Sequence, residues 1–270
     1  MKVNTLLSIL ALALTACQAP PTPAQVLLTR ADWGEAFTEE GADGTFVLYH
    51  PRTGLTEQYH PERAAIRYCP ASTFKVYNAL VALETGAVRD VDSLHAWDGQ
   101  ERVLPIWNRD HSLRSGIRYS TVWLFQRLAR DIDREAYATA FAKTPYGNAA
   151  VGADISTFWL DGSLRISADE QVRFLDHLRR GETGFAKAHE DSVYAMVPLL
   201  GSGVVDGEPY RLLGKTGWGM PDGEPEIGWL VGYLERGGDT LVYAMNSEEV
   251  SDYDIVGGRE RIVRSILGLR

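Results

Sequence analysis

The chain has 270 residues, of which 45% are hydrophobic and 23% are charged. A chain of this length buries a substantial core, which excludes miniprotein scaffolds, and its composition excludes disordered and collagen-like classes. It fits one large domain or two closely packed subdomains. The formal net charge of −9 offers no basic field for a phosphate backbone, and no cluster of lysines and arginines is interleaved with aromatic residues. Nucleic acid is therefore not an expected partner.

The first residues have the pattern of an export signal. Lys2 precedes an apolar run over residues 6–14, and small residues follow the run. The run is too short to span a bilayer, which takes about 20 apolar residues. Leu14-Thr15-Ala16-Cys17 resembles the lipobox of a bacterial lipoprotein, in which cleavage before the cysteine exposes its thiol for lipidation. We therefore predict a signal peptide over residues 1–17 and a periplasmic product tethered to the membrane by lipid on Cys17. Ordinary cleavage at a nearby small-x-small site, which would leave a free periplasmic protein, is the alternative.

A proline-rich linker over residues 18–25 is expected to hold a globular domain, residues 26–270, away from a surface. If Cys17 is lipidated, Cys69 has no partner within the chain, so no internal disulfide is expected. No two histidines or cysteines have the His-x-x-x-His or Cys-x-x-Cys spacing of a tight zinc site. We therefore expect no metal.

The predicted elements run from strands to helices and back to strands. Alternating apolar residues predict an early β-hairpin, and helical spacing dominates from about Ser72 to Leu200. Ser167 and Glu170 form a capping box for one helix, which Gly181 ends. The predicted strands lie at residues 45–49, 55–59, 210–214, 227–234 and 240–246, and the predicted helices at residues 72–85, 122–132, 167–181 and 259–267.

This order of elements predicts an α/β (α+β) fold. A mainly antiparallel sheet is expected from residues 26–67 and 205–270, with a helical subdomain over residues 68–204 inserted between them. The cleft is then expected between the sheet and the helices.

Lysine is scarce, with five lysines against twenty-two arginines, so the position of each lysine is informative. Lys75 follows Ser72 by three residues, and on a helix these two side chains lie one above the other. The surrounding helix is apolar nearly all round, so burial is expected to lower the pKa of Lys75 and to supply a neutral base beside a hydroxyl. The helix N-terminus would offer amides to a developing oxyanion. The alternative for this motif alone is a surface serine that caps a helix, with a solvated lysine.

A second candidate motif is Lys215-Thr216-Gly217, at the end of a predicted strand. Pro209 stands where a phosphate-binding loop needs its first glycine, and a strand rather than a helix surrounds the lysine, so the phosphate interpretation fails. Alternation sends Lys215 and Gly217 to one face of the strand and Thr216 to the other, and Gly217 leaves room for a ligand's backbone. The alternative for this motif alone is a polar strand end before a glycine-rich turn.

Together the two motifs resemble those of penicillin-binding proteins and serine β-lactamases. The sequence has no Ser-Asp-Asn element; instead, Ser120-Thr121-Val122-Trp123 stands between them, followed by Tyr146-Gly147-Asn148 and the segment 158–167. This series resembles class D (oxacillinase-type) β-lactamases from about Phe46 to Leu267. The resemblance implies a penicillin-binding/β-lactamase-type fold and hydrolysis of β-lactam antibiotics through a serine acyl-enzyme.

The resemblance also implies roles for the residues of the first motif. Ser72 matches the nucleophile. Lys75 matches a lysine that carbon dioxide carbamylates to N6-carboxylysine, the general base of both acylation and deacylation, and no other cofactor is implied. Only a neutral amine adds to carbon dioxide, and burial favours that form. Trp159 matches the residue whose indole N–H binds the carbamate. Val122, where relatives carry asparagine, would keep the surroundings of the lysine apolar.

Other positions match groups that handle the substrate. Ser120 matches the residue that relays a proton to the leaving lactam nitrogen, with electrostatic support from Lys215. The amides of Ser72 and Trp218 match the oxyanion hole. Arg259 and Thr216 match the residues that bind the substrate carboxylate, and Gly217 and Val122 are further candidates for substrate binding.

The remaining expectations concern the carboxylate site, the third motif and two tryptophans. Arginine suits a carboxylate site because its fork binds a carboxylate bidentately. Tyr146 and Asn148 belong to the third motif, where a loop-shaping role is at least as well supported as a chemical one. Trp33 and Trp107 are expected in the core.

The same framework serves β-lactam sensor domains, which stay acylated, and peptidoglycan transpeptidases and carboxypeptidases. Sensors of this type are fused to membrane-spanning segments, whereas this sequence has only a cleavable signal, and cell-wall enzymes usually carry asparagine at the position of Val122. The residues therefore favour a hydrolase, with a sensor or penicillin-binding protein as the alternative. The expected partners are β-lactam small molecules and, through Cys17, a membrane; the motifs predict neither the drug spectrum nor an oligomeric state.

Overall fold

The computed structural model describes residues 26–249 and 254–269. The predicted signal peptide, Cys17 and the proline-rich linker lie outside these residues. Within the two described ranges, no helix combines the length and the apolar character that a membrane span needs.

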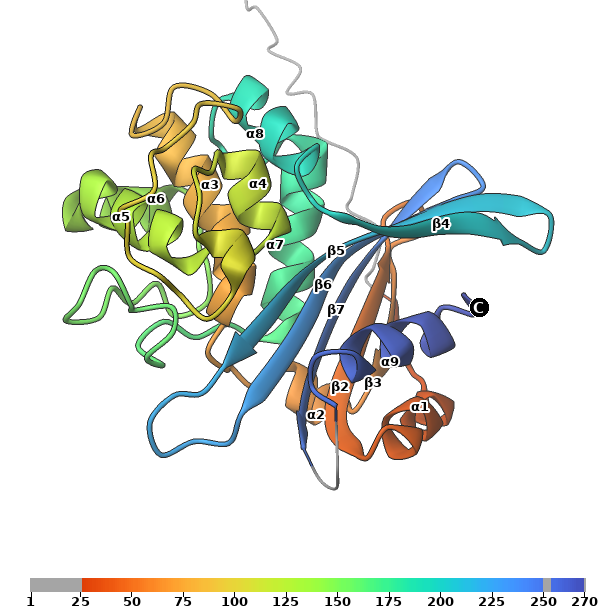
Figure 1. Cartoon of the computed structure of the whole chain (residues 1–270). Helices are drawn as coiled ribbons and strands as arrows, with labels where there is room; N and C mark the ends of the chain where they lie inside the picture. Colours follow the sequence, from red (N-terminus) through yellow and green to blue (C-terminus); the bar gives the residue numbers. More distant parts are fainter. Residues whose placement is uncertain (1–25, 250–253, 270) are drawn as a thin grey trace, which may run out of the picture.

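A seven-stranded sheet forms the centre of the described chain (Figure 1). Its strand order is β1-β3-β2-β7-β6-β5-β4, in which β1 runs parallel to β3 and the other neighbours are antiparallel. The strands are β1 (Val26–Thr29), β2 (Ala42–His50), β3 (Leu55–Tyr59), β4 (Leu199–Val205), β5 (Glu208–Gly219), β6 (Ile227–Arg236) and β7 (Asp239–Glu249). Early and late strands meet where β2 pairs with β7, so both ends of the described chain build one sheet, as predicted.

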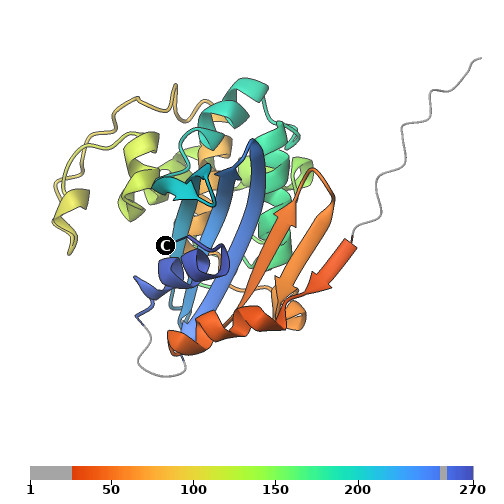
Figure 2. The ribbon, with the colours of Figure 1, turned by 90° about the vertical axis from the view of Figure 1, so that its right-hand side faces the viewer.

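Helices cover both faces of this sheet. Helix α7 packs on β2 and β7 on one face, whereas α1 and α9 cover the other, and Figure 2 shows the strands between α9 and α7. The helices are α1 (Gly34–Glu39), α2 (Pro61–Ala64), α3 (Phe74–Glu84), α4 (Leu113–Arg118), α5 (Val122–Ile132), α6 (Arg134–Lys143), α7 (Ala168–Arg180), α8 (Lys187–Tyr194) and α9 (Gly258–Ile266), with the 3-10 turns η1 (Ala31–Trp33), η2 (Ala71–Thr73) and η3 (Pro105–Trp107). The predicted fold class is confirmed.

Local sequence signals explain the best-predicted elements. The Ser167 side chain accepts a hydrogen bond from the Glu170 amide and the Glu170 side chain returns one, which is the capping box expected at the start of α7. Gly181 ends α7 in a left-handed conformation with φ of 70°. Gly54, with φ of 72°, turns the chain between β2 and β3.

Two hydrophobic clusters flank the sheet. One packs α3 and its neighbouring helices against the sheet, and the other lies under α1 and α9. Residues 74–83 of α3 are all buried, so this helix runs through the centre of the first cluster. Trp33 is buried as predicted, at 6% exposure, whereas Trp107 is only partly buried at the edge of the cluster.

One difference from the sequence prediction lies between the helical segment and the late strands. The sequence predicts helical spacing to about Leu200, whereas α8 ends at Tyr194 and β4 begins at Leu199. Strand β4 is mostly exposed and lies at the edge of the sheet, so its residues lack the alternation that marks a half-buried strand. Its place is decided by pairing with β5, a contact between segments that a local pattern does not record.

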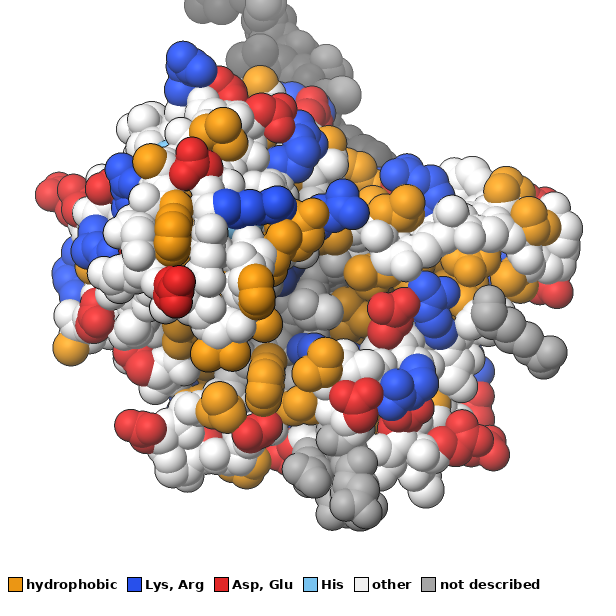
Figure 3. Space-filling view, viewed as in Figure 1, with side chains coloured by type: hydrophobic (Ala, Val, Ile, Leu, Met, Phe, Trp, Pro, Cys, Tyr) orange, Lys and Arg blue, Asp and Glu red, His pale blue; other side chains and the backbone are white. Residues whose placement is uncertain are grey.

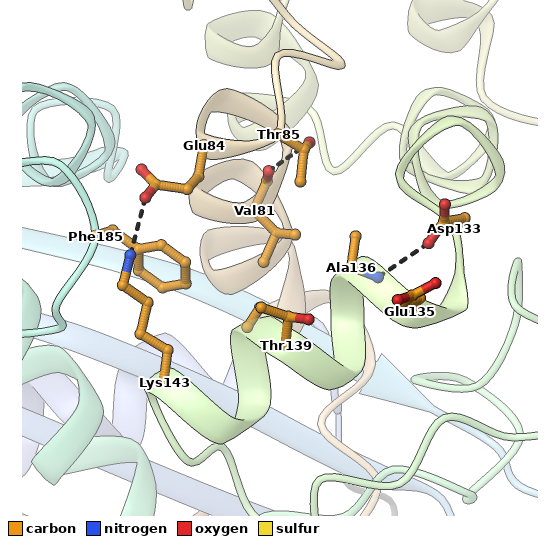
Figure 4. Close-up of a pocket in the computed structure, with 10 residues that line it drawn as sticks. Val81, Glu84, Thr85, Asp133, Glu135, Ala136, Thr139, Lys143 and Phe185 are labelled. Carbon is orange, nitrogen blue, oxygen red and sulfur yellow. Dashed lines mark hydrogen bonds and ion pairs between the residues drawn. The ribbon is translucent and has the colours of Figure 1, made fainter.

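A cavity of about 400 Å³ lies between the C-terminal half of α3 and α6, and none of the predicted site residues lines it (Figure 4). Glu84 on one wall accepts hydrogen bonds from Lys143 Nζ at 2.9 Å and from the Ala186 amide at 3.1 Å, and it pairs with His189 Nδ1 at 3.0 Å. Burial raises the pKa of Glu84, but these hydrogen bonds outweigh burial and lower the pKa to about 2. One carboxylate therefore ties α3 to α6 and α8.

We expect Glu84→Gln to lower the free energy of unfolding by about 1 kcal/mol at pH 7, a value kept small because solvent partly screens this group, whose side chain is 28% exposed. A lowered pKa stabilises the folded state above pH 4.5, and this contribution is lost as the pH falls through about 2. Urea unfolding at pH 7 and pH 2 measures the difference. Glu135→Gln, on the opposite wall of the cavity, is the control, because the described residues form no ion pair with Glu135. Equal effects of the two substitutions would contradict this account.

Candidate active site

The 3-10 turn η2 runs directly into α3 and brings Ser72 and Lys75 together. Lys75 Nζ and Ser72 Oγ are hydrogen-bonded at 2.6 Å, the contact expected from their spacing on a helix. Ala71, immediately before the serine, has a φ of 47°, a left-handed conformation that costs a non-glycine residue about 1–2 kcal/mol. The surrounding packing therefore holds this turn in a geometry that the chain would not choose by itself.

Lys75 is fully buried, with 0% exposure, so the predicted burial is confirmed. Its amine lies 5.6 Å from the centre of the Phe125 ring on α5, one turn after the partly buried Val122. Burial lowers the pKa of Lys75 from 10.5 to about 7. The described residues form no ion pair with this amine. A substantial fraction of the amine is therefore neutral and nucleophilic near neutral pH.

Ser120 and Lys215 form a second pair in the site. Lys215 Nζ donates to Ser120 Oγ at 3.0 Å and to the Thr216 carbonyl at 2.7 Å, and the side chain is 2% exposed. Burial, followed by the positive charges of Lys75 and Arg259, lowers the pKa of Lys215 well below its usual value. The two lysines are therefore close enough to oppose each other's protonation.

Ser120 lies in a turn that ends helix α4 and that usually contains glycine. The Ser120 amide donates to the Ile117 carbonyl at 3.3 Å and the Thr121 amide donates to the Gly116 carbonyl at 2.9 Å, the pair of bonds of a Schellman motif at the end of α4. The left-handed position of this motif usually holds glycine, but here it holds Ser120, with φ of 55°. In this turn the Ser120 hydroxyl lies beside Lys215.

The residues of the Lys-Thr-Gly motif alternate between the two faces of strand β5, as predicted. Lys215 and Gly217 are buried on one face, while Thr216 is partly exposed on the other. The prediction that Gly217 leaves room for a ligand needs a correction, because a Cβ at this position would lie 2.9 Å from the Pro70 carbonyl oxygen and 3.1 Å from Thr73. The missing side chain instead lets β5 pack against the turn that carries Ser72.

Thr216 and Trp218 lie on the opposite face of β5, and Arg259 of α9 lies on the same side of the sheet. Trp218 pairs in register with Gly228, and a Cβ on Gly228 would lie 3.0 Å from Arg259 Cδ, so these residues face α9. Arg259 is buried, and its guanidinium donates to the Gly217 carbonyl and, at 3.3 Å, to the Val256 carbonyl. The predicted carboxylate-binding residues therefore lie together at one end of β5.

The open edge of β5 presents backbone amides toward the site. The Gly214 amide donates to the Pro198 carbonyl at 2.9 Å on the β4 side, and the pairing of β4 with β5 reaches no further than Leu213. The amides of Thr216 and Trp218, two and four residues later, point to the same side of the strand. The Trp218 amide, predicted for the oxyanion hole, thus points to the free edge, while its half-exposed indole donates to Glu226 at 3.1 Å.

Trp159 is fully buried and stacks on Phe74, the residue before Lys75, with ring centres 5.6 Å apart. Its indole N–H has no hydrogen-bond acceptor among the described residues. The Cys69 thiol, which the sequence did not single out, donates to the Trp159 carbonyl at 3.1 Å and helps fix this residue. Burial raises the pKa of that thiol to about 11, so Cys69 is an inert packing residue.

The Tyr146-Gly147-Asn148 motif shapes a loop. Tyr146 is buried, and its hydroxyl lies 3.4 Å from Gln171 Oε1. A Cβ on Gly147 would lie 1.8 Å from the Arg165 carbonyl oxygen, so only glycine fits there. The Asn148 side chain accepts the Arg165 amide at 2.9 Å and donates to the Ser163 carbonyl at 2.9 Å. These contacts tie the motif to the segment that carries Trp159, and they involve none of the reacting groups.

The structure therefore brings Ser72, Lys75, Ser120 and Lys215 together between the helices and β5. Figure 3 shows the surface hollowed where the helical part meets the sheet, with hydrophobic side chains along the border of the hollow. Two features of the site were missed in the sequence. The left-handed backbones of Ala71 and Ser120 have no signal in their residue types, because a non-glycine residue rarely adopts this conformation.

Comparisons with known proteins agree with this geometry. The penicillin binding protein transpeptidase domain matches residues 44–268. The β-lactamase OXA-15 of Pseudomonas aeruginosa is 37% identical over 242 residues, which cover 89% of this chain and 84% of that protein. The structure of FUS-1 (OXA-85), a class D β-lactamase from Fusobacterium nucleatum subsp. polymorphum, superposes with a TM-score of 0.82 at 34% identity and covers 89% of this chain and 97% of that one. The C-terminal domain of the Bacillus licheniformis BlaR penicillin receptor gives a TM-score of 0.81 at 30% identity, covering 92% and 99%.

The chain therefore belongs to the penicillin-binding protein transpeptidase domain family. Its relatives define it more narrowly. It is a class D β-lactamase, a hydrolase of β-lactam antibiotics of the kind that confers antibiotic resistance, and the sequence-based prediction of the family is confirmed.

The strained turn at Ser120 gives a test of stability against function. Ser120→Gly and Ser120→Ala both remove the hydroxyl, but only glycine relieves the left-handed strain. We therefore expect the free energy of unfolding to be about 1 kcal/mol higher for the glycine variant than for the alanine variant. Both variants should lose turnover. Denaturant unfolding and nitrocefin hydrolysis measure the two effects, and equal stabilities of the two variants would show that the turn is unstrained.

Proposed function

We propose that this enzyme opens β-lactams through an acyl-enzyme on Ser72, with a carbamate on Lys75 as the general base of both half-reactions. The observation that carries the proposal is the buried amine of Lys75, 2.6 Å from the Ser72 hydroxyl and without an ion pair among the described residues. A neutral amine adds to carbon dioxide, forming the N–C bond of the carbamate and releasing one proton. The product is an anion beside the nucleophile.

The surroundings of Lys75 support this modification. The indole N–H of Trp159 is buried without an acceptor among the described residues, and leaving such a donor unpaired costs about 1–3 kcal/mol. A carbamate oxygen would accept this hydrogen bond and remove the penalty. Lys215 supports the same conclusion, because two buried ammonium groups oppose each other, whereas a carbamate on Lys75 would give the Lys215 ammonium a counter-charge.

In the proposed acylation step the carbamate takes the Ser72 proton while Ser72 Oγ attacks the lactam carbonyl carbon. The amides of Ser72 and Trp218 stabilise the oxyanion, a contribution of several kcal/mol for such donors. The lactam C–N bond then breaks, and Ser120, hydrogen-bonded to Lys215 at 3.0 Å, passes a proton to the leaving nitrogen. Ser120 regains a proton from the protonated carbamate by way of Lys215, which restores the carbamate anion. Thr216 would hold the substrate carboxylate together with Arg259.

In deacylation the carbamate takes a proton from water as the water oxygen attacks the ester carbonyl. The ester C–O bond then breaks, and the carbamate returns this proton to Ser72 Oγ, which frees the acid product and restores the enzyme. A sensor that stays acylated is the second candidate, favoured by the likeness to the BlaR receptor domain. Mass spectrometry after mixing with a penicillin separates the two. Rapid product release with unmodified Ser72 supports the hydrolase, whereas a stable adduct on Ser72 without turnover would overturn it.

We predict that turnover falls as the pH drops below about 7 and returns on addition of bicarbonate. A lysine with a lowered pKa is neutral above that pKa and protonated below it, and the ammonium form cannot hold carbon dioxide. Steady-state rates at pH 5.5 to 8, in degassed buffer with and without bicarbonate, measure the effect. Full activity in degassed acidic buffer would contradict the carbamate.

We predict that Lys75→Ala abolishes turnover, whereas Trp159→Phe slows release of the acyl-enzyme at least tenfold, because it removes the only hydrogen bond that the indole offers to the carbamate. Burst kinetics separate acylation from release. Trp33→Phe, in the cluster on the other face of the sheet, is the matched control. Equal, mild losses in the Lys75 and Trp159 variants would contradict the roles assigned to them.

We also propose export to the periplasm with lipid on Cys17, on the strength of the apolar run over residues 6–14 and the lipobox-like sequence that follows it. Fractionation of cells that express the full chain tests this point. The wild type should sediment with membranes, and Cys17→Ser should be released as a free protein or remain unprocessed. Equal release of both would support ordinary cleavage.

A further inference from the structure

Trp107 lies close to the catalytic turn, although the sequence suggested a core residue. Its indole N–H donates to the Tyr119 carbonyl at 2.8 Å. Tyr119 is the last residue before Ser120, and its carbonyl belongs to the peptide unit whose orientation fixes the φ of Ser120. The Schellman motif satisfies the carbonyls of Gly116 and Ile117 in the last turn of α4. The indole of Trp107 satisfies the Tyr119 carbonyl that follows.

Trp107 is itself held from the other side of the turn. Trp123, near the start of α5, donates its indole N–H to the Trp107 carbonyl at 2.8 Å. The ring of His111 lies 6.1 Å from the ring of Trp123, and His111 Nε2 is 2.9 Å from the Ile106 carbonyl, next to Trp107. The segment before Ser120 and the helix after it are thus joined across the turn by two indole hydrogen bonds. A residue that merely fills space needs neither bond, and Trp107 is only partly buried.

We propose that Trp107 is a positioning residue for Ser120. Its indole hydrogen bond holds the Tyr119–Ser120 peptide unit in the left-handed turn, so that the Ser120 hydroxyl stays on Lys215 Nζ instead of relaxing away. Strained backbone persists only where the surroundings over-determine it, and this bond is one of the determinants. The inference rests on the proposed role of Ser120 as the proton relay to the lactam nitrogen. It therefore concerns acylation and leaves deacylation untouched.

Trp107→Phe tests the proposal, because it keeps an aromatic ring but removes the N–H donor. We expect the acylation rate with nitrocefin to fall about tenfold, the effect of one lost hydrogen bond, with an unchanged deacylation rate. Trp97→Phe is the matched control, since the Trp97 indole lies in the same connection between α3 and α4 but donates to the Gln100 carbonyl at 3.1 Å. It should leave both rates unchanged.

A double-mutant cycle shows whether Trp107 acts through Ser120. In a Ser120→Ala background the Trp107→Phe substitution should have no further effect on acylation, which a general loss of packing would not reproduce. If Trp107→Phe folds poorly, benzothienylalanine at this position keeps the shape of the ring without its N–H and gives the same test. A tenfold loss that persists in the Ser120→Ala background, or equal losses in deacylation and in the Trp97 control, would overturn the proposal.

These outcomes remain distinct from a failure of the proposed function. If Ser120→Ala acylates as fast as the wild type, the relay role of Ser120 is wrong and the positioning role of Trp107 falls with it. If Ser120→Ala is slow but Trp107→Phe is normal in acylation, the relay stands and only the positioning role is refuted.

Discussion

One buried amine determines how this site is built. Lys75 lies fully inside the molecule, hydrogen-bonded to Ser72, and no carboxylate among the described residues offsets its charge. Such a position penalises the ammonium form, so the protein keeps a reactive base at the cost of unfavourable electrostatics. Helix α3 makes this possible because it is buried on every side, between the other helices and the sheet. The close approach of β5 at Gly217 completes the burial.

The site also keeps local strain that the scaffold must resist. Ala71 and Ser120 both adopt left-handed conformations, and each adjoins or carries a group proposed for the chemistry. At Ser120, glycine would suit the turn better, but it would bring no hydroxyl to Lys215. The hydrogen bonds of the helix end and the indole of Trp107 hold the turn in place. Stability and function therefore make opposite demands on the same residue, as in many enzymes.

The sequence predicted the elements whose signals are local. Three of these signals depend only on residues that are close in the sequence, and each feature is present. They are the capping box at Ser167, the helix end at Gly181 and the spacing of Ser72 and Lys75. Strand β4 was missed because pairing with β5 determines it. The sequence also did not show why position 217 needs glycine. The residue that excludes a side chain there is Pro70, which is distant in the sequence. Backbone strain at Ser120 and the indole bond of Trp107 likewise become visible only when the segments are assembled.

Carbon-13 NMR shows directly whether Lys75 works as a carbamate. The enzyme is equilibrated with carbon-13 bicarbonate above pH 7, and its spectrum is recorded under conditions in which the enzyme is active. We expect one protein-bound carbamate signal that is absent from Lys75→Ala and disappears reversibly as the pH falls below the pKa of about 7. A fully active enzyme without that signal, or a signal that persists in Lys75→Ala, would contradict it.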